Sequence, residues 1–278
     1  MRLEVARAIR TTHNSLQVIV GGNSIHYEIS GSGPWLTLSH PLACHLCVWD
    51  EQMPALAAKF TVLRYDVRGH GDSSAPAGYY TLEQLADDAH ELFNLLGIKR
   101  THWVGLSMGS MIGQTFALKY PGLLQSLTLA STTGHYPPQT IAALEGRIQN
   151  VTANGLETVV DPTLERWFTG HYRETHPQVM NRIAGYIRAT SIAGYAGCCH
   201  AVSRIDLTGR LKKIKCPTLV MVGAQDTGTP VAMARTIYHE IWGAELTIIP
   251  SAAHLLNIER TTAFNTALLS FLGRASVL

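Results

Sequence analysis

Short apolar runs alternate with amphipathic helical patterns along most of this chain of 278 residues, and this alternation restricts the possible folds more than any other feature. A strand, a helix and a second strand in succession predict two parallel strands joined by a crossover helix. Repetition of this unit predicts an α/β fold with a mostly parallel sheet flanked by helices. Eight strands are expected, at residues 16–20, 26–30, 35–39, 61–65, 101–105, 124–130, 218–223 and 245–250.

Local signals mark where several helices begin and end. Thr81 and Gln84 have the spacing of a capping box, and Gly97 follows the last apolar residue of that helical pattern. Between them the apolar side chains recur at helical spacing. Further helices are expected at 108–120, from Pro230 after a capping Thr229, and from Glu259.

The alternation stops at about residue 134 and returns at about residue 216. The intervening stretch has helical patterns and no strong strand signal. We therefore expect an α/β core made of residues 1–134 and 216–278, with residues 135–215 forming a helical cap over the ends of the strands.

The motif G-x-S-x-G occurs at residues 105–109, between an apolar strand and a helical run. A sharp turn from strand to helix forces its central residue into strained dihedral angles, and only small residues fit on either side. The turn exposes the serine hydroxyl at the start of a helix. Ser107 is therefore the predicted nucleophile.

A serine hydroxyl needs a base to remove its proton and an acid to orient that base. His254 is the one histidine that follows the last strand, and Asp226 follows the strand before it. The order Ser107, Asp226, His254 along the chain is the order that a hydrolase of this architecture requires. A surface histidine and a helix-capping aspartate are the alternative interpretations.

The developing oxyanion of such a reaction needs two backbone N–H groups. Met108, next to the nucleophile, is expected to supply one, and Leu42, in the loop after the third strand, the other. His40 in that loop is expected to have a structural role. Asp66 and Arg68, in the turn after the fourth strand, are expected to hold that turn rigid and to take no part in catalysis.

Two cysteine pairs suggest other chemistry. Cys44 and Cys47 have the spacing of a metal or redox pair, and Cys198 and Cys199 could form a vicinal thiol switch. Free cysteine is often a small buried apolar residue, and no second cluster with zinc spacing exists. We favour burial for both pairs and expect no metal and no organic cofactor.

Composition excludes several classes of partner. Hydrophobic residues make up 46% of the chain and charged residues 15%, which suits a globular protein with a large core. The formal net charge of +2 is dispersed, so nucleic acid is not an expected partner. No apolar run is long enough to cross a membrane, and no secretory signal is evident. With five cysteines and no export signal, we expect a cytoplasmic protein that binds a small molecule.

Several stretches together resemble the α/β-hydrolase superfamily and, within it, the 3-oxoadipate enol-lactonases. They lie at residues 63–73, 104–109, 194–199, 206–207 and 254–259. The resemblance carries the catalytic triad of the family onto Ser107, Asp226 and His254, and its oxyanion donors onto Leu42 and Met108. Two positions depart from many relatives: Pro41 and Ser110 stand where those proteins have glycine. Pro41 has no N–H, but the expected donor is Leu42.

The resemblance implies a serine hydrolase that cleaves a small ester or lactone through an acyl-enzyme, in the catabolism of aromatic compounds. A general carboxylesterase and a carbon–carbon bond hydrolase remain open as enzymatic alternatives. A slow or non-hydrolytic ligand receptor is the alternative of another class. Arginines of the cap are candidates to bind a substrate carboxylate, but the sequence does not single one out: Arg147, Arg166, Arg173, Arg182, Arg188 and Arg204.

Overall fold

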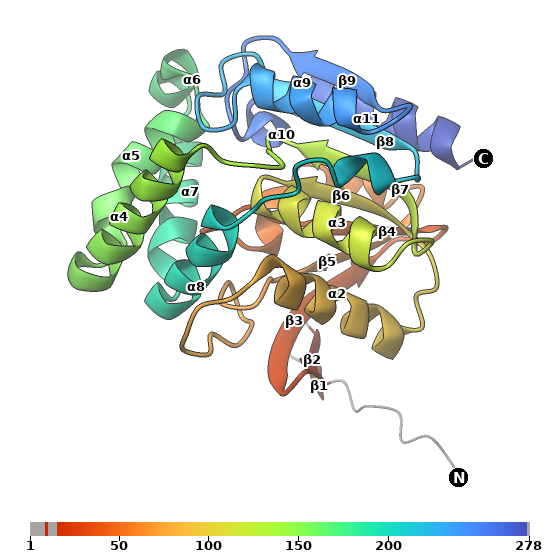
Figure 1. Ribbon diagram of the computed structural model, residues 1–278, viewed down its shortest axis with the longest axis horizontal. Helices are drawn as coiled ribbons and strands as arrows, with labels where there is room; N and C mark the ends of the chain where they lie inside the picture. The colour runs from red at the N-terminus through yellow and green to blue at the C-terminus, as the bar shows by residue number, and fades with distance from the viewer. Residues whose placement is uncertain (1–8, 11–15, 277–278) are drawn as a thin grey trace.

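The strands of the described chain form one sheet in the order β1-β2-β3-β5-β4-β6-β7-β8-β9 (Figure 1). The computed structural model describes residues 9–10 and 16–276. All eight predicted strands are present as β2 to β9, and the two-residue β1 adds to the edge. Their bounds are β1 (Ile9–Arg10), β2 (Leu16–Val20), β3 (Asn23–Ser30), β4 (Trp35–Ser39), β5 (Thr61–Tyr65), β6 (Thr101–Leu106), β7 (Leu124–Ala130), β8 (Thr218–Gly223) and β9 (Glu245–Ile249).

The sheet changes from antiparallel to parallel along its width. β2 and β3 form an antiparallel hairpin, and β3 also runs antiparallel to β5. The hairpin turn is Gly21-Gly22, whose φ angles of 54° and 81° match a tight turn with two left-handed residues. From β5 onward, every neighbouring pair is parallel. The carboxyl ends of these strands therefore meet at one edge of the sheet, as the predicted fold requires.

Helices connect these strands and cover both faces of the sheet (Figure 1). The predicted capping box at Thr81 and Gln84 is present, and Gly97 ends α2 with a φ of 71°. Two predictions were wrong in detail. Pro230 precedes α9 and is not its first residue, and the last helical region divides in two at Arg260. The helices before β7 and after β8 are η1 (Leu46–Trp49), α1 (Met53–Leu56), α2 (Leu82–Leu96), α3 (Met108–Lys119), α9 (Val231–Glu240), α10 (Leu256–Glu259) and α11 (Thr261–Ala275). The short helix η2 (Leu211–Lys213) lies just before β8.

Two consecutive residues of β6 show what covers each face. The Trp103 ring is fully buried against Phe93 of α2 and Phe116 of α3, with ring centroids 6.2 and 5.3 Å away. The His102 side chain points to the opposite face, because successive side chains of a strand alternate. Its Nε2 lies 3.3 Å from the hydroxyl of Ser276, just after α11. Thus α2 and α3 cover one face and α11 the other.

A run of helices separates β7 from β8 and lies to one side of the sheet (left in Figure 1). We call α4 to α8 the helical segment. Its helices are α4 (Pro138–Asn154), α5 (Glu157–Trp167), α6 (Gly170–Thr175), α7 (Pro177–Ala189) and α8 (Ile192–Ser203). None of the helices in the described residues is both long and apolar enough to cross a bilayer.

Helix α8 joins the helical segment to the core by a backbone-to-backbone contact. A Cβ added to Gly194 would lie 1.9 Å from the Gly69 carbonyl oxygen, so no side chain fits there. Nearby, the Cys198 thiol contacts the Arg68 carbonyl oxygen at 3.4 Å. Both partners lie in the turn after β5, which therefore carries the start of α8.

This contact predicts that Gly194→Ala destabilises the fold. Overpacking a full site costs about 1–3 kcal/mol, and here the obstacle is backbone that cannot rotate away. Gly185→Ala is the matched control, because a Cβ at this helical glycine of α7 meets nothing within 4 Å. Urea unfolding should show a large loss for Gly194→Ala and none for Gly185→Ala. Equal free energies of unfolding would contradict the prediction.

Candidate active site

Ser107 lies at the turn between β6 and α3, as the motif predicts. Its φ of 54° and ψ of −111° are strained for a residue with a side chain. A Cβ on Gly105 would be 2.4 Å from the Gly109 carbonyl carbon, and one on Gly109 would be 2.0 Å from the Ser39 carbonyl oxygen. The flanking positions therefore have to be glycine. The Ser107 side chain does not cap α3.

Asp226 and His254 lie at the ends of β8 and β9 and contact each other. Asp226 Oδ2 is 2.8 Å from His254 Nδ1, and both residues are buried. Oδ1 accepts the N–H groups of Gly228 and Thr229, each at 2.9 Å, and Oδ2 also accepts the Thr229 hydroxyl at 2.8 Å. The predicted capping residue Thr229 therefore serves the carboxylate and does not cap α9.

These contacts determine the charge of the pair. Burial by itself would raise the pKa of Asp226, but the charge of His254 and the hydrogen bonds outweigh burial, and the pKa is lowered. Asp226 is thus ionised at neutral pH and can only accept. His254 Nδ1 must then carry the proton, which leaves Nε2 of the neutral ring as an acceptor.

A cavity of about 240 Å³ brings the predicted site residues together. Ser107, Met108, Leu42 and His254 all line it, and Asp226 lies behind His254. These residues form one wall of the cavity. The wall is made of four segments of the core, which follow β4, β6, β8 and β9. The volume is below the roughly 300–1,000 Å³ of sites for drug-sized ligands, which suits a smaller molecule.

Leu42 and Met108, the two predicted oxyanion donors, both line the cavity. Met108 is the first residue of α3, so its N–H has no carbonyl partner within the helix. Leu42 lies in a loop that buried histidines hold on both sides. His40 Nδ1 contacts the Pro41 carbonyl oxygen at 2.8 Å, and His70 Nε2 accepts the Ala43 N–H at 3.0 Å.

Each of these histidines also has to be neutral, because a protonated ring nitrogen cannot accept a hydrogen bond: His70 Nε2 accepts the Ala43 N–H, and His40 Nε2 accepts the Val67 N–H at 2.9 Å. Burial lowers the pKa of His40 to about 4 and that of His70 to about 3. The structural role expected for His40 is therefore present, and His70 is a second support that the sequence analysis did not single out.

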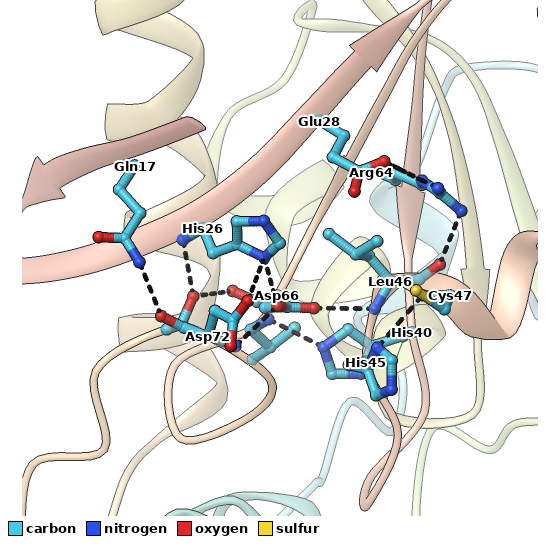
Figure 2. A network of polar contacts seen from close by, with 12 residues as sticks. Gln17, His26, Glu28, His40, His45, Leu46, Cys47, Arg64, Asp66 and Asp72 are labelled. Carbon is cyan, nitrogen blue, oxygen red and sulfur yellow. Dashed lines mark hydrogen bonds and ion pairs between the residues drawn. The ribbon is translucent and has the colours of Figure 1, made fainter. Parts of the chain in front are cut away.

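The turn after β5 is held by Asp66, as predicted (Figure 2). Its carboxylate accepts the N–H groups of Leu46 and Asp72, at 2.8 and 3.0 Å, and lies 2.6 Å from His26 Nδ1. Burial would raise the pKa of Asp66, but these contacts lower it. Asp66 does not line the cavity that holds Ser107. Its acceptor capacity is used to fix the turn and the loop after β4.

The cysteines are free thiols. Burial raises the pKa of all four thiols in the two pairs: Cys44, Cys47, Cys198 and Cys199. The value is about 12 for Cys47 and about 11 for Cys199. Thiols with such pKa values are poor nucleophiles at neutral pH. Within residues 9–10 and 16–276, no group of three histidine, cysteine or acidic side chains could hold a metal ion. Cys44, Cys198 and Cys199 are buried, as the favoured interpretation expects, whereas Cys47 is only partly buried.

The helical segment supplies the opposite wall of the cavity and places two arginines in it. Arg147 follows Thr140 and Leu144 along one face of α4, and Arg166 follows Thr163 along one face of α5. Burial, together with the charge of Arg147, lowers the pKa of Arg166 to about 10. Arg166 donates to the Thr163 hydroxyl at 3.0 Å.

These two arginines differ from others of the helical segment in their partners. Arg182, Arg188 and Arg204 form ion pairs with Glu51, Glu157 and Glu145. Arg147 and Arg166 have no ion pair with any carboxylate of the described chain. The cavity therefore holds two guanidinium groups that form no ion pair within the described residues.

A sheet of this order with a strained serine at the β6–α3 turn defines an α/β-hydrolase fold. A family model described as the alpha/beta hydrolase fold matches residues 34–261, and the chain belongs to this family. The 3-oxoadipate enol-lactonase 2 of Acinetobacter baylyi is 33% identical, with 90% of this chain and 94% of that protein covered. A putative carbamate hydrolase, RutD, of Agrobacterium fabrum is 26% identical, with coverage of 89% and 98%.

Solved structures give the same family assignment. A hydrolase from Pseudomonas aeruginosa superposes with a TM-score of 0.91 at 39% identity, covering 95% of this chain and all of that one. An enol-lactonase from Burkholderia xenovorans superposes with a TM-score of 0.89 at 35% identity, covering 92% and 99%. The chain is therefore similar over most of its length to hydrolases that include enol-lactonases.

The lowered pKa of Asp226 predicts how Asp226→Asn changes acid sensitivity. A carboxyl with a lowered folded-state pKa stabilises the protein above its ordinary pKa, and this stabilisation is lost as the pH falls through the folded-state value. Asparagine does not titrate. The free energy of unfolding of Asp226→Asn should therefore change less than that of the wild type between about pH 5 and about pH 3. Urea unfolding at several pH values measures this, and parallel curves would contradict it.

Proposed function

We propose that the protein is a serine hydrolase that cleaves a small ester or lactone through an acyl-enzyme. The observation that carries the proposal is the convergence of three groups at one cavity. The strained Ser107 and His254 line it, and the buried Asp226 carboxylate lies 2.8 Å behind the histidine. This set supplies the nucleophile, the base and the orienting acid of acyl transfer.

In the proposed acylation step, His254 Nε2 takes the proton of the Ser107 hydroxyl as the serine oxygen attacks the substrate carbonyl carbon. The carbonyl oxygen becomes an oxyanion, which accepts hydrogen bonds from the Leu42 and Met108 N–H groups. The ester bond then breaks, and His254 returns the proton to the departing oxygen. In a lactone that oxygen stays attached to the acyl group.

Deacylation repeats the same steps with water as the nucleophile. His254 removes a proton from water, and the hydroxide attacks the acyl carbon through a second oxyanion. Ser107 leaves with the proton that His254 returns. Asp226 keeps the imidazole oriented throughout and stabilises the imidazolium that forms in each step. The product is an acid.

We propose residues 135–215 as the cap of this hydrolase, and residues 1–134 and 216–278 as the core that carries the chemistry. The core wall holds Ser107 and His254, whereas the cap wall holds Arg147 and Arg166. Guanidinium groups bind carboxylates through paired, charge-assisted hydrogen bonds. These two arginines thus support a substrate that carries a free carboxylate away from its ester or lactone bond.

The names of relatives agree with this substrate class without defining it. Two of the curated relatives are 3-oxoadipate enol-lactonases, and others are named carbamate hydrolase or (E)-2-((N-methylformamido)methylene)succinate hydrolase. Those names cover lactone, carbamate and amide chemistry. A lactone or ester is favoured here because one of these enol-lactonases is 33% identical to this chain, against 26% for the carbamate hydrolase of Agrobacterium fabrum.

The nucleophile is tested by Ser107→Ala. Turnover of p-nitrophenyl esters should fall by several orders of magnitude, because neither His254 nor the oxyanion donors can replace the missing oxygen. Covalent labelling by a fluorophosphonate should disappear in parallel, and mass spectrometry of the labelled wild type should locate the adduct on Ser107. A variant that still labels or turns over at the wild-type rate would exclude this mechanism.

The substrate class is tested by Arg166→Met. We expect kcat/KM for an acid-bearing ester to fall by about tenfold or more, because a substrate carboxylate would lose a desolvated partner. Turnover of a neutral ester of the same size should not fall. Arg188→Met is the control, because Arg188 pairs with Glu157 at the surface. If methylating the substrate carboxylate leaves wild-type kcat/KM unchanged, the cavity has no carboxylate site.

A further inference from the structure

A buried carboxylate near His254 joins the histidine loop to the helical segment. Glu259, the last residue of α10, is only 5% exposed. Its Oε2 accepts the Ala253 N–H at 2.8 Å, directly before His254 in the chain. Its Oε1 accepts both the N–H, at 3.1 Å, and the hydroxyl of Thr169, at the start of α6. One side chain thus contacts both the loop before His254 and Thr169, which lies 90 residues from Glu259 in the sequence.

A second contact lies on the other side of His254. The Leu255 N–H donates to the Trp167 carbonyl oxygen at 3.0 Å. The Trp167 ring lines the cavity and lies nearly parallel to the His254 imidazole, with an interplanar angle of 18° and centroids 6.3 Å apart. The backbone is therefore held at the residue before His254 and at the residue after it. Both contacts reach the stretch from Trp167 to Thr169. The Leu255 contact is direct, and the Ala253 contact passes through Glu259.

The two carboxylate oxygens of Glu259 accept every hydrogen bond of this bridge. All three groups that contact Glu259 are donors, and they approach its two oxygens from two different segments. A glutamine side chain has one acceptor oxygen, and its NH₂ group would face a donor on the other side. A buried N–H that loses its acceptor is costly, so a weakened bridge favours separation of the two segments.

We propose that Glu259 is a positioning residue that couples the cap to His254. It fixes the position of the His254 ring through Ala253 and that of the Trp167 ring through Thr169. The base and this part of the cavity wall therefore keep one relative position. The proposal rests on the proposed role of His254 as general base. It predicts that the two arms of the bridge affect different steps.

Glu259→Gln tests the arm to His254. We expect fluorophosphonate labelling of Ser107 to slow by about tenfold or more, because misplacing a catalytic group by about 1 Å can cost a hundredfold in rate. The reagent is small, so labelling reports on Ser107 and its base. Glu145→Gln is the control for loss of a charge, because Glu145 pairs with Arg204 at the surface, and it should label at the wild-type rate.

Thr169→Val tests the arm to the cap, and Thr169→Ser is its conservative partner. Valine removes the hydroxyl donor to Glu259, whereas serine keeps it. We expect valine to raise KM for an acid-bearing ester by about threefold or more, at the lower end of what one lost hydrogen bond changes, with a smaller change in labelling. Serine should restore the wild-type KM. Thr169 does not line the cavity, so a direct contact with substrate does not explain such a shift.

The outcomes separate this proposal from the proposed function. Wild-type protein that does not label at Ser107 would overturn the proposed function. Wild-type protein that labels, with a folded Glu259→Gln that labels at the same rate, would overturn the coupling alone. Should Glu259→Gln fail to fold, the Thr169 pair decides: equal KM values for valine and serine overturn the coupling, and a rise for valine alone supports it. A lowered melting temperature with unchanged kinetics also overturns it.

Discussion

The lack of space around Ser107 determines where every other part of this site can lie. Gly109 packs its backbone against Ser39 at the end of β4, with no room for a Cβ. Because β4 and β6 are hydrogen-bonded neighbours, the same contact brings the loop after β4 to the start of α3. Leu42 and Met108 therefore line the same cavity because Gly109 lets these two segments approach each other. This packing also holds Ser107 at its positive φ, because the surrounding backbone leaves the turn no room to relax.

Ser107, Asp226 and His254 could be predicted from the sequence because each lies in the turn or loop that follows a strand. Parallel strands bring their carboxyl ends to one edge, so Ser107, Asp226 and His254 were expected near each other before any distance was known. The cavity and the contact of 2.8 Å between Asp226 and His254 agree with that expectation. The sequence did not indicate that Thr229 serves Asp226, because a threonine before a proline has the same appearance as a helix cap.

The part of the site on the helical segment could not be predicted, because it depends on which arginines line the cavity and which pair with carboxylates elsewhere in the chain. Arg188 and Arg204 pair with acids 31 and 59 residues away, and nothing local in the sequence distinguishes them from Arg166. Glu259 is a similar case, since its cap partner Thr169 is 90 residues distant. The arginine pairs follow from how α4 to α8 pack on one another, and the Glu259 contact follows from how they pack on the core. Helical periodicity carries no information about either packing.

The charges on the two walls of the cavity also orient the substrate and favour release of the product in the proposed reaction. The ionised Asp226 lies behind His254 on the core wall, and Arg147 and Arg166 lie on the cap wall. A substrate with one carboxylate is therefore oriented with that group toward the arginines and its neutral ester carbonyl toward Ser107. Hydrolysis creates a second carboxylate at Ser107, next to a histidine that has become neutral again and an aspartate that is still negative. The new charge is repelled from the core wall, so the deacylation step that releases the acid from Ser107 also weakens the binding of this product at that end of the cavity.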